Sequence, residues 1–364
     1  MQRKRTEQAL PLICRIFFLV GAVSLYVLVI ALISPYFANV CNRVICAPLR
    51  ALLATLTSLF PFSIAEIALY LLLPAAVLLI VFALRRFGET WRDVLRFSLV
   101  IVSVLALLFS TFVFTLGVAY RTEALEERLS FVRVQVSEVT LGETATRLVE
   151  ELNVLADDVT YGEDGFSVMP YNLREMNDNI LMAYTRLSQA YPFVQSMNSR
   201  IKPVIASRAM SFTHITGVYS FYTGEANLNT HFPDYTLPFT AAHEFAHQRG
   251  IARENEASFI AFLALDGADD VYLQYVAKLN VLEYVASALY RANSGTYREV
   301  MGRLDGRVLG ELRAYATFFE EFENSAAANV SDTVNDAYLK LNGNEAGSES
   351  YSLVVELVVA YYCQ

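Results

Sequence analysis

Three uncharged apolar stretches in the first third of the chain limit most strongly what it can fold into. They run over about residues 16–34, 67–84 and 97–120, and each approaches the roughly 20 residues with which a helix crosses a bilayer. Charged residues stand only at their ends, which argues against buried helices of a water-soluble core. We therefore expect a membrane domain over residues 1–120, with three transmembrane helices and the lipid bilayer as its partner.

The distribution of lysine and arginine predicts how this membrane domain is oriented. Basic residues precede the first stretch and fill the short loop between the second and third: Arg3, Lys4, Arg5, Arg15, Arg85, Arg86, Arg92 and Arg96. The loop over 35–66 holds only Arg43 and Arg50. Because basic loops stay on the cytoplasmic side, we expect a multi-pass protein of the cell membrane with a cytoplasmic N-terminus and an extracytoplasmic C-terminal domain.

The remaining residues, 121–364, are expected to form that extracytoplasmic domain. Apolar residues recur at helical spacing over segments such as 144–157 and 271–292, whereas residues 215–232 alternate as in a strand or hairpin. The apolar segment 351–362 is too short to span a membrane and is expected to be a core helix. The predicted fold class is mainly α, with a small β element.

Composition excludes several classes of protein. The 364 residues are 55% hydrophobic and 18% charged, as expected for a membrane part joined to an aqueous part. A net charge of -9 argues against a nucleic-acid partner. The four cysteines form no CxxC pair, which excludes a zinc–thiolate cluster. Cys41 and Cys46 share the predicted outer loop, where they could form a disulfide or stay free, and the sequence leaves both open.

An HExxH motif is the strongest chemical signal in the chain. His243 and His247 are four residues apart, so on a helix both imidazoles can reach one metal ion. Glu244 stands beside them and can act as the base for a metal-activated water. Gly250 is a natural residue to end the helix. The motif predicts a zinc site in which Glu244 is catalytic and the two histidines are ligands.

The third protein ligand of a catalytic zinc is expected from the next helix. That helix should start near Ala252, and it opens with Glu254 and Glu256, which lie about 200° apart and cannot both face the metal. Glu254 is the preferred ligand, because Ser258 one turn later supplies a polar group behind it; Glu256 is the alternative. A purely structural role also stays open, since helix N-termini favour carboxylates.

The motif and its surroundings resemble known families. HExxH followed by Glu254-Asn255-Glu256-Ala257-Ser258 resembles the gluzincins, whose third ligand is a glutamate on the following helix, although Ser258 stands where they usually have Asp or Asn. The longer run from Ile215 to Leu263 resembles a bacterial family of membrane-anchored proteins of unknown function with an outer HExxH domain. The resemblance implies a zincin-like metallopeptidase with zinc as cofactor, and it brings no known substrate.

The resemblance also suggests roles for residues upstream of the motif. Gluzincins place an edge strand over the zinc, and Tyr222–Asn229 is the candidate here for pairing with an extended peptide; a hairpin packed on the core is the alternative. Asn227 is a candidate for substrate binding or for support of the site. His231 or Tyr219 could stabilise an oxyanion, although side chains of both types more often have structural roles.

The sequence therefore predicts a membrane-anchored zinc peptidase that hydrolyses peptide bonds of a peptide or protein outside the cytoplasm. The alternative is a non-catalytic, zinc-stabilised sensor or scaffold on the cell surface, against which Glu244 argues, because a structural site needs no base. A transporter is disfavoured, because the apolar stretches hold no ionisable residue at their centres.

Overall fold

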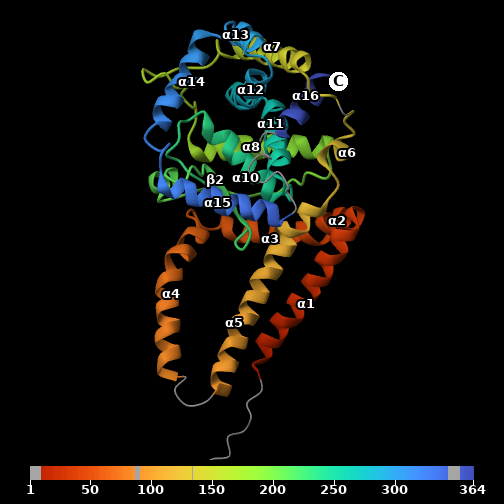
Figure 1. Ribbon diagram of the computed structural model, residues 1–364, viewed down its shortest axis with the longest axis vertical. Helices are drawn as coiled ribbons and strands as arrows, with labels where there is room; N and C mark the ends of the chain where they lie inside the picture. The colour runs from red at the N-terminus through yellow and green to blue at the C-terminus, as the bar shows by residue number, and fades with distance from the viewer. Residues whose placement is uncertain (1–9, 87–90, 133, 343–352) are drawn as a thin grey trace, which may run out of the picture.

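The computed structural model describes residues 10–86, 91–132, 134–342 and 353–364, so the predicted basic residues at 3–5 lie outside its described part. Figure 1 shows long helices that extend from one side of a rounded helical body. The prediction of a mainly helical chain with several apolar N-terminal helices is confirmed.

Three long helices extend away from the body: α1 (Leu12–Ile33), α4 (Ile64–Arg86) and α5 (Trp91–Phe112). Most of their side chains are apolar and exposed; Leu73, near the middle of α4, is 75% exposed. Helices α1 and α5 pack closely at Gly21, where a Cβ atom would lie 2.9 Å from the Cβ of Ala106. Such continuous exposed apolar surface is typical of helices that face lipid.

A fourth segment is also long and apolar enough to cross a membrane. It covers Pro35–Ser58, whereas the sequence predicted three such segments. It consists of α2 (Pro35–Cys41), a π-helical turn η1 (Asn42–Cys46) and α3 (Ala47–Ser58), and it lies across the upper ends of α1, α4 and α5 (Figure 1). Cys41 and Cys46 are both free, with their sulfur atoms 4.0 Å apart.

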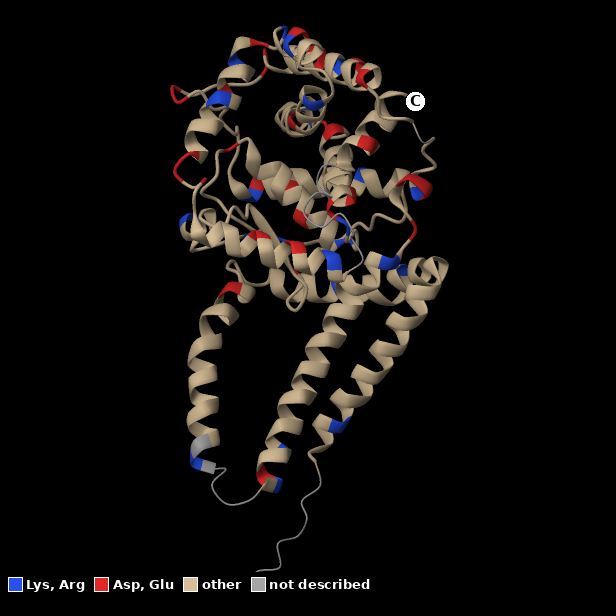
Figure 2. Ribbon diagram, viewed as in Figure 1, with Lys and Arg blue, Asp and Glu red and all other residues tan. Residues whose placement is uncertain are grey.

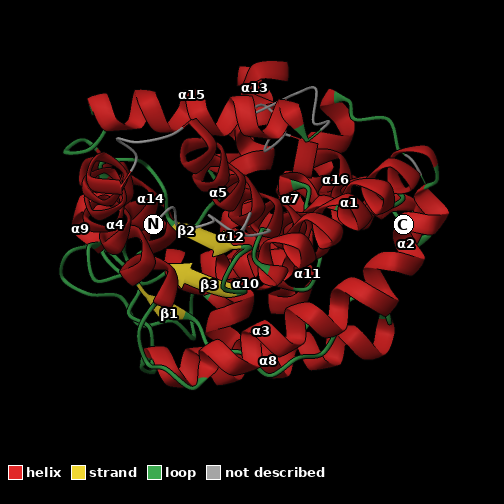
Figure 3. Cartoon of the chain, turned by 90° about the horizontal axis from the view of Figure 1, so that it is seen from below, coloured by secondary structure: helices red, strands yellow, loops and turns green. Residues whose placement is uncertain are grey.

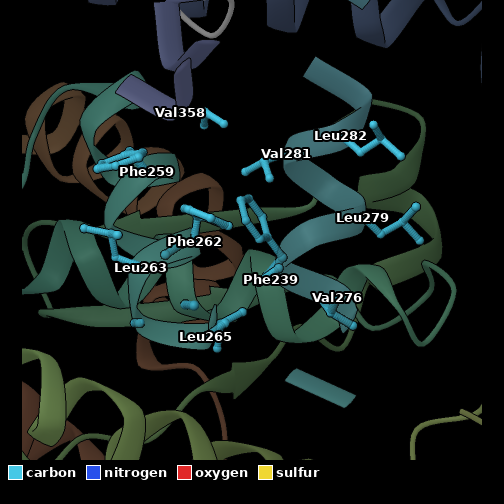
Figure 4. Close-up of a cluster of buried hydrophobic side chains, with 14 of the residues drawn as sticks. Phe239, Phe259, Phe262, Leu263, Leu265, Val276, Leu279, Val281, Leu282 and Val358 are labelled. Atoms are coloured by element: carbon cyan, nitrogen blue, oxygen red, sulfur yellow. The ribbon is translucent and has the colours of Figure 1, made fainter. Parts of the chain in front are cut away.

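The centre of the body is a set of helices packed through one apolar core. These are α7 (Glu138–Leu155), α8 (Leu173–Ala190), α10 (Thr236–Gln248), α11 (Glu254–Asp266), α12 (Val271–Ala292) and α16 (Val354–Tyr362). Figure 4 shows Phe239 of α10, Phe259 and Phe262 of α11, and Leu279 of α12 in this core. Helix α16 confirms the predicted short core helix at the end of the chain.

Further elements surround this core. They are the π-helical turn η2 (Val113–Gly117), the 3₁₀ turn η3 (Ala119–Arg121), α6 (Leu125–Leu129), α9 (Ser207–Ser211), α13 (Ser294–Met301), α14 (Gly306–Phe319) and α15 (Ala326–Leu341). Helix α15 lies beside the upper ends of the apolar helices, at the base of the body (Figure 1).

A small sheet lies beside α10 and is the predicted β element (Figure 3). Its strands are β1 (Lys202–Pro203), β2 (Gly217–Ser220) and β3 (Glu225–Leu228), in the order β1-β3-β2. Strand β3 pairs in parallel with β1 and antiparallel with β2. Because β3 is paired on both sides, the prediction that Tyr222–Asn229 supplies an edge strand is wrong. The segment instead belongs to the β2–β3 hairpin, and β1 and β2 are the edge strands.

Hydrogen bonds join the sheet to the apolar helices. The carboxylate of Glu225 on β3 accepts the backbone N–H groups of Ile64 and Ala65 at the start of α4, at 3.0 and 2.8 Å. In return, Glu66 of α4 accepts the N–H groups of Ile205 and Ala206, at 2.8 and 2.9 Å. These reciprocal bonds satisfy helix-terminal and loop donors that would otherwise be buried without partners.

Candidate metal centre

The centre is built where α10 ends and α11 begins. Helix α10 ends at Gln248, and Gly250 then adopts a left-handed conformation with φ of +83°, which glycine tolerates best. A side chain at this position would also overlap the guanidinium of Arg50 from α3. Arg50 is 1% exposed and donates hydrogen bonds to the carbonyl oxygens of Thr115 and Arg249. The turn therefore brings α11 back beside α10.

Three predicted ligands converge across this turn. The Nε2 atoms of His243 and His247 lie 3.1 and 3.3 Å from the same oxygen, Oε2 of Glu254. Ligand atoms at roughly 2.0 to 2.1 Å from a tetrahedral zinc ion are separated from one another by about 3.3 Å. The donor set and its spacing therefore fit zinc. No other group of three or more such donors occurs in the part of the chain that the structure describes.

Both histidines are oriented by a second hydrogen bond. The Nδ1 atom of His247 lies 2.8 Å from the carbonyl oxygen of Ile251, to which only a protonated nitrogen can donate, so its Nε2 atom is left for a ligand. The Nδ1 atom of His243 lies 3.1 Å from Oγ of Ser258. Ser258 thus lies behind a ligand, as predicted, in the place where gluzincins usually have Asp or Asn.

Glu256 points away from the centre. Its carboxylate accepts the backbone N–H of Leu125 at 3.0 Å and pairs with the guanidinium of Arg253 at 2.6 Å. It therefore reaches neither the histidines nor a substrate beside them. Of the two glutamates that the sequence offered, the structure brings Glu254 to the histidines.

Glu244 lies beside the three donors with an unpaired oxygen. The residue is 5% exposed, and its Oε2 atom has no hydrogen-bond partner among the described residues. Burial, with the nearby charge of Glu254, raises its pKa to about 8, although His247 and the backbone N–H of Tyr219 act in the opposite direction. A carboxylate with such a pKa can take up a proton near neutral pH and release it again.

The charges of the donor residues hold the cluster together. Burial disfavours a charged imidazole, yet the carboxylate of Glu254 raises the pKa of His247 to about 9. Burial lowers the pKa of His243. Burial also opposes ionisation of Glu254, but the two histidines hold its pKa well below the usual range. A metal ion that binds here must therefore displace the proton of His247.

Strand β2 crosses directly beside Glu244. A Cβ atom at Gly217 would lie 2.8 Å from the Oε1 atom of Glu244 and 2.7 Å from the Cγ2 atom of Thr240. Glycine at this position is therefore required sterically for the strand to approach α10. No local sequence pattern predicts this role, because Gly217 lies beside residues more than twenty positions later in the chain.

The donors line a cavity of about 1140 Å³. All four residues of β2 line it, together with residues at the start of α4 and side chains from α12, α14 and α15. From α12 and α14 come Glu283, Tyr284 and Tyr315, none of which belongs to a sequence motif. Sequence reasoning missed these residues because only the folded chain brings them beside α10.

Three other residues proposed from the sequence have different surroundings. Tyr219 lines the cavity but packs against Leu116 and Ala252, and its hydroxyl has no partner among the described residues. Asn227 donates to the carbonyl oxygen of Val218 and so supports the β2–β3 pair. His231 packs edge-on between Phe318 and Phe322 and is not among the lining residues, so it does not reach the reacting groups.

Comparison with known proteins gives a family and no activity. The model of the family described as "Protein of unknown function (DUF3810)" matches residues 42–359, which include η1, α3 and the candidate metal centre. Neither a curated protein nor a solved structure matches the chain significantly.

Proposed function

We infer a function for this chain, which belongs to the DUF3810 family: a membrane-anchored zinc peptidase that hydrolyses peptide bonds outside the cytoplasm. The observation that carries the proposal is the convergence of His243, His247 and Glu254 beside the unpaired carboxylate oxygen of Glu244. A zinc ion held by these three residues would polarise a scissile carbonyl and lower the pKa of a water molecule.

Glu244 is the proposed general base and acid. It takes a proton from the attacking water and delivers it to the nitrogen of the departing amine, so one carboxylate serves both proton transfers. Its raised pKa supports this role, because the group must be able to hold a proton as well as to give it up. The unpaired Oε2 atom leaves one oxygen available for these transfers.

The free edge of β2 is the proposed place for the substrate backbone. A peptide in extended conformation can add to an exposed edge as a further strand through main-chain hydrogen bonds. Strand β2 is unpaired on one side and lines the cavity along its whole length. The approach of Gly217 to Glu244 would bring such a peptide close to the proposed base.

In the proposed topology, α1, α4 and α5 span the membrane and the Pro35–Ser58 segment lies along its outer face. Figure 2 shows basic residues at the far ends of α1, α4 and α5, away from the body, as the positive-inside rule requires of cytoplasmic ends. Arg50 supports the placement of α3, because its buried guanidinium bonds the turn after α10. The body with the metal centre is then extracytoplasmic.

The chemistry is tested with the full-length protein in detergent. Zinc content and cleavage of a mixed peptide library are measured for the wild type and for Glu244→Gln, which keeps the size of the side chain. We expect one zinc ion per chain in both, and a loss of cleavage by about 10² to 10⁴ in the variant. Equal cleavage by both would contradict the role of Glu244. A zinc-loaded wild type that cleaves nothing would favour the sensor or scaffold.

The topology is tested with a thiol reagent that does not cross membranes. Cys363 is exposed on the body, whereas Cys14, Cys41 and Cys46 are buried, so labelling of the wild type in intact cells reports on Cys363. We expect labelling that Cys363→Ser abolishes. A second cysteine, Trp91→Cys in the Cys363→Ser background, should react only after permeabilisation. The reverse pattern would place the body in the cytoplasm.

A further inference from the structure

Apart from its histidines, the charged side chains of the cavity beside the metal centre are all acidic. Its described lining contains no lysine or arginine and five carboxylates: Glu66, Glu244, Glu254, Glu283 and Asp332. Glu66 is saturated by backbone N–H groups, Glu254 joins the histidines, and Glu244 is the proposed base. Glu283 and Asp332 are left without an assigned role.

Glu283 faces the cavity without a counter-ion. Its side chain on α12 is exposed to the cavity, and no hydrogen bond or ion pair engages it among the described residues. Among the described residues, the charged group that acts on it most strongly is another carboxylate, that of Glu311. Surrounding protein and this second negative charge raise the pKa of Glu283 to about 7. A positively charged group would relieve both effects.

Aromatic rings complete the surroundings of Glu283. Tyr235, Tyr284 and Tyr315 line the same cavity as Glu283, and Tyr284 is the next residue on α12. The rings of Tyr235 and Tyr315 meet edge to face, with centroids 5.8 Å apart. Ring faces attract ammonium and guanidinium groups, most strongly where water is excluded. A carboxylate among tyrosine rings is thus suited to a cation.

This group of residues adjoins the proposed reaction site. Tyr235 precedes α10 and stands eight residues before His243, about 12 Å along the helix axis. Between them, Thr236, Phe239 and Thr240 line the same cavity. On the other side, Tyr284 lines the same cavity as Ser258, whose hydroxyl lies 3.1 Å from the Nδ1 atom of His243. A substrate bound at the metal centre can therefore extend a side chain or terminus to Glu283.

We propose that Glu283 determines the specificity of the centre, and that its substrates carry an amine or guanidinium group that binds between this carboxylate and the rings of Tyr284 and Tyr315. The inference rests on the proposed peptidase function. In a peptide, the cation is either the side chain of a lysine or arginine near the scissile bond, or a free N-terminal amine.

The test uses full-length, zinc-loaded protein and pairs of peptides that differ only in charge. Lysine is replaced by norleucine and arginine by citrulline, which keep the approximate shape of each side chain. We expect kcat/KM to favour the charged member by about 10- to 100-fold, the usual range for a hydrogen bond to a charged group. Glu283→Gln should abolish the preference. The matched control Glu320→Gln, at an exposed position after α14, should keep it.

Blocked peptides distinguish the two sources of the cation. If acetylation of the N-terminus removes cleavage while lysine and norleucine peptides react equally, the bound group is the terminal amine, and Glu283→Gln should then remove the preference for free termini. Cleavage that depends on Glu244 but shows no preference for either cation overturns the role of Glu283 and leaves the peptidase standing.

If no peptide is cleaved, the proposed peptidase function is contradicted. The role of Glu283 is then tested by ligand binding. The probes are lysine and norleucine hydroxamates, titrated against zinc-loaded wild type and Glu283→Gln. Tighter binding of the lysine compound by about tenfold in the wild type only supports the cationic subsite. Equal affinities in the wild type overturn it.

Discussion

The long helices α1, α4 and α5 and the paired helices α10 and α11 are all rich in apolar residues, yet their sequences act differently. Along α4 most side chains are exposed, and many apolar residues could replace one another. Along α10 and α11 nearly every side chain is buried, and His243, His247 and Glu254 each have one place in a cluster of donors. In the first region the total apolar length matters; in the second, each position matters.

The largest effect is expected from loss of a histidine at the centre. His243→Ala removes one of three donors, so zinc should no longer copurify, and cleavage should fall by more than about 10⁴. Metal content and activity are measured together, with a thermal melt to detect the loss of metal-linked stability. His231→Phe is the control, because His231 lies among aromatic rings away from the donors. If His243→Ala still bound zinc, the proposal that all three donors are needed to hold the metal would be contradicted.

The next effect is expected at the turn between α10 and α11. Gly250→Ala places a side chain at a positive φ, which costs about 1 to 2 kcal/mol, and overlaps Arg50 as well. We expect a clearly lower melting temperature and weaker zinc binding. Gly306→Ala is the control, since its added Cβ meets nothing within 4 Å. Similar melting temperatures for the two variants would contradict a specific requirement for glycine at this turn. The α10–α11 region would then tolerate substitution as the exposed face of α4 is expected to.

A smaller, pH-dependent effect is expected at Glu283. Its pKa of about 7 in the folded chain lies above the ordinary value of 4.5, so the folded state binds this proton more tightly than the unfolded state. Stability from this group is therefore lost as the pH rises from about 4.5 through 7. Glu283→Gln should match the wild type in melting temperature at pH 4.5 and exceed it at pH 8. A constant difference across this range would contradict the shifted pKa.

The smallest effect is expected on the exposed face of α4. Leu73→Val keeps an apolar side chain at a position that is 75% exposed, and the free energy of unfolding should change by no more than about 0.5 kcal/mol. Zinc content and cleavage should be unchanged. A large loss of activity would break the comparison, because it would mean that this face of α4 has a specific partner.

The parts of the fold that depend on local pattern could be predicted from the sequence. Apolar length identified α1, α4 and α5, and helical spacing placed His243 and His247 on one face. The choice of Glu254 over Glu256 followed from the angle between them, which lets only one face the histidines, and from Ser258 one turn after Glu254. Each inference needed only residues within a few turns of one another.

The parts that depend on distant contacts could not be predicted. Arg50 is a charge within an apolar segment, and its buried partners lie 65 and 199 residues away. The edge position of β2 depends on β1, a two-residue strand that gives no pattern of its own. Glu283 resembles any exposed glutamate on a helix until the fold places it in the cavity.

The hydrogen bonds between Glu66 of α4 and the loop before α9 determine how far the proposed base lies from the membrane surface. Because Glu66, Leu69 and Tyr70 belong to the cavity wall, the proposed base is held at a fixed height above the end of α4, which is proposed to span the membrane. A substrate anchored in the same bilayer would meet it only if its scissile bond stood at that height. The apolar helices α1, α4 and α5 would then contribute to specificity, because peptide bonds would be selected by their distance from the lipid surface as well as by sequence.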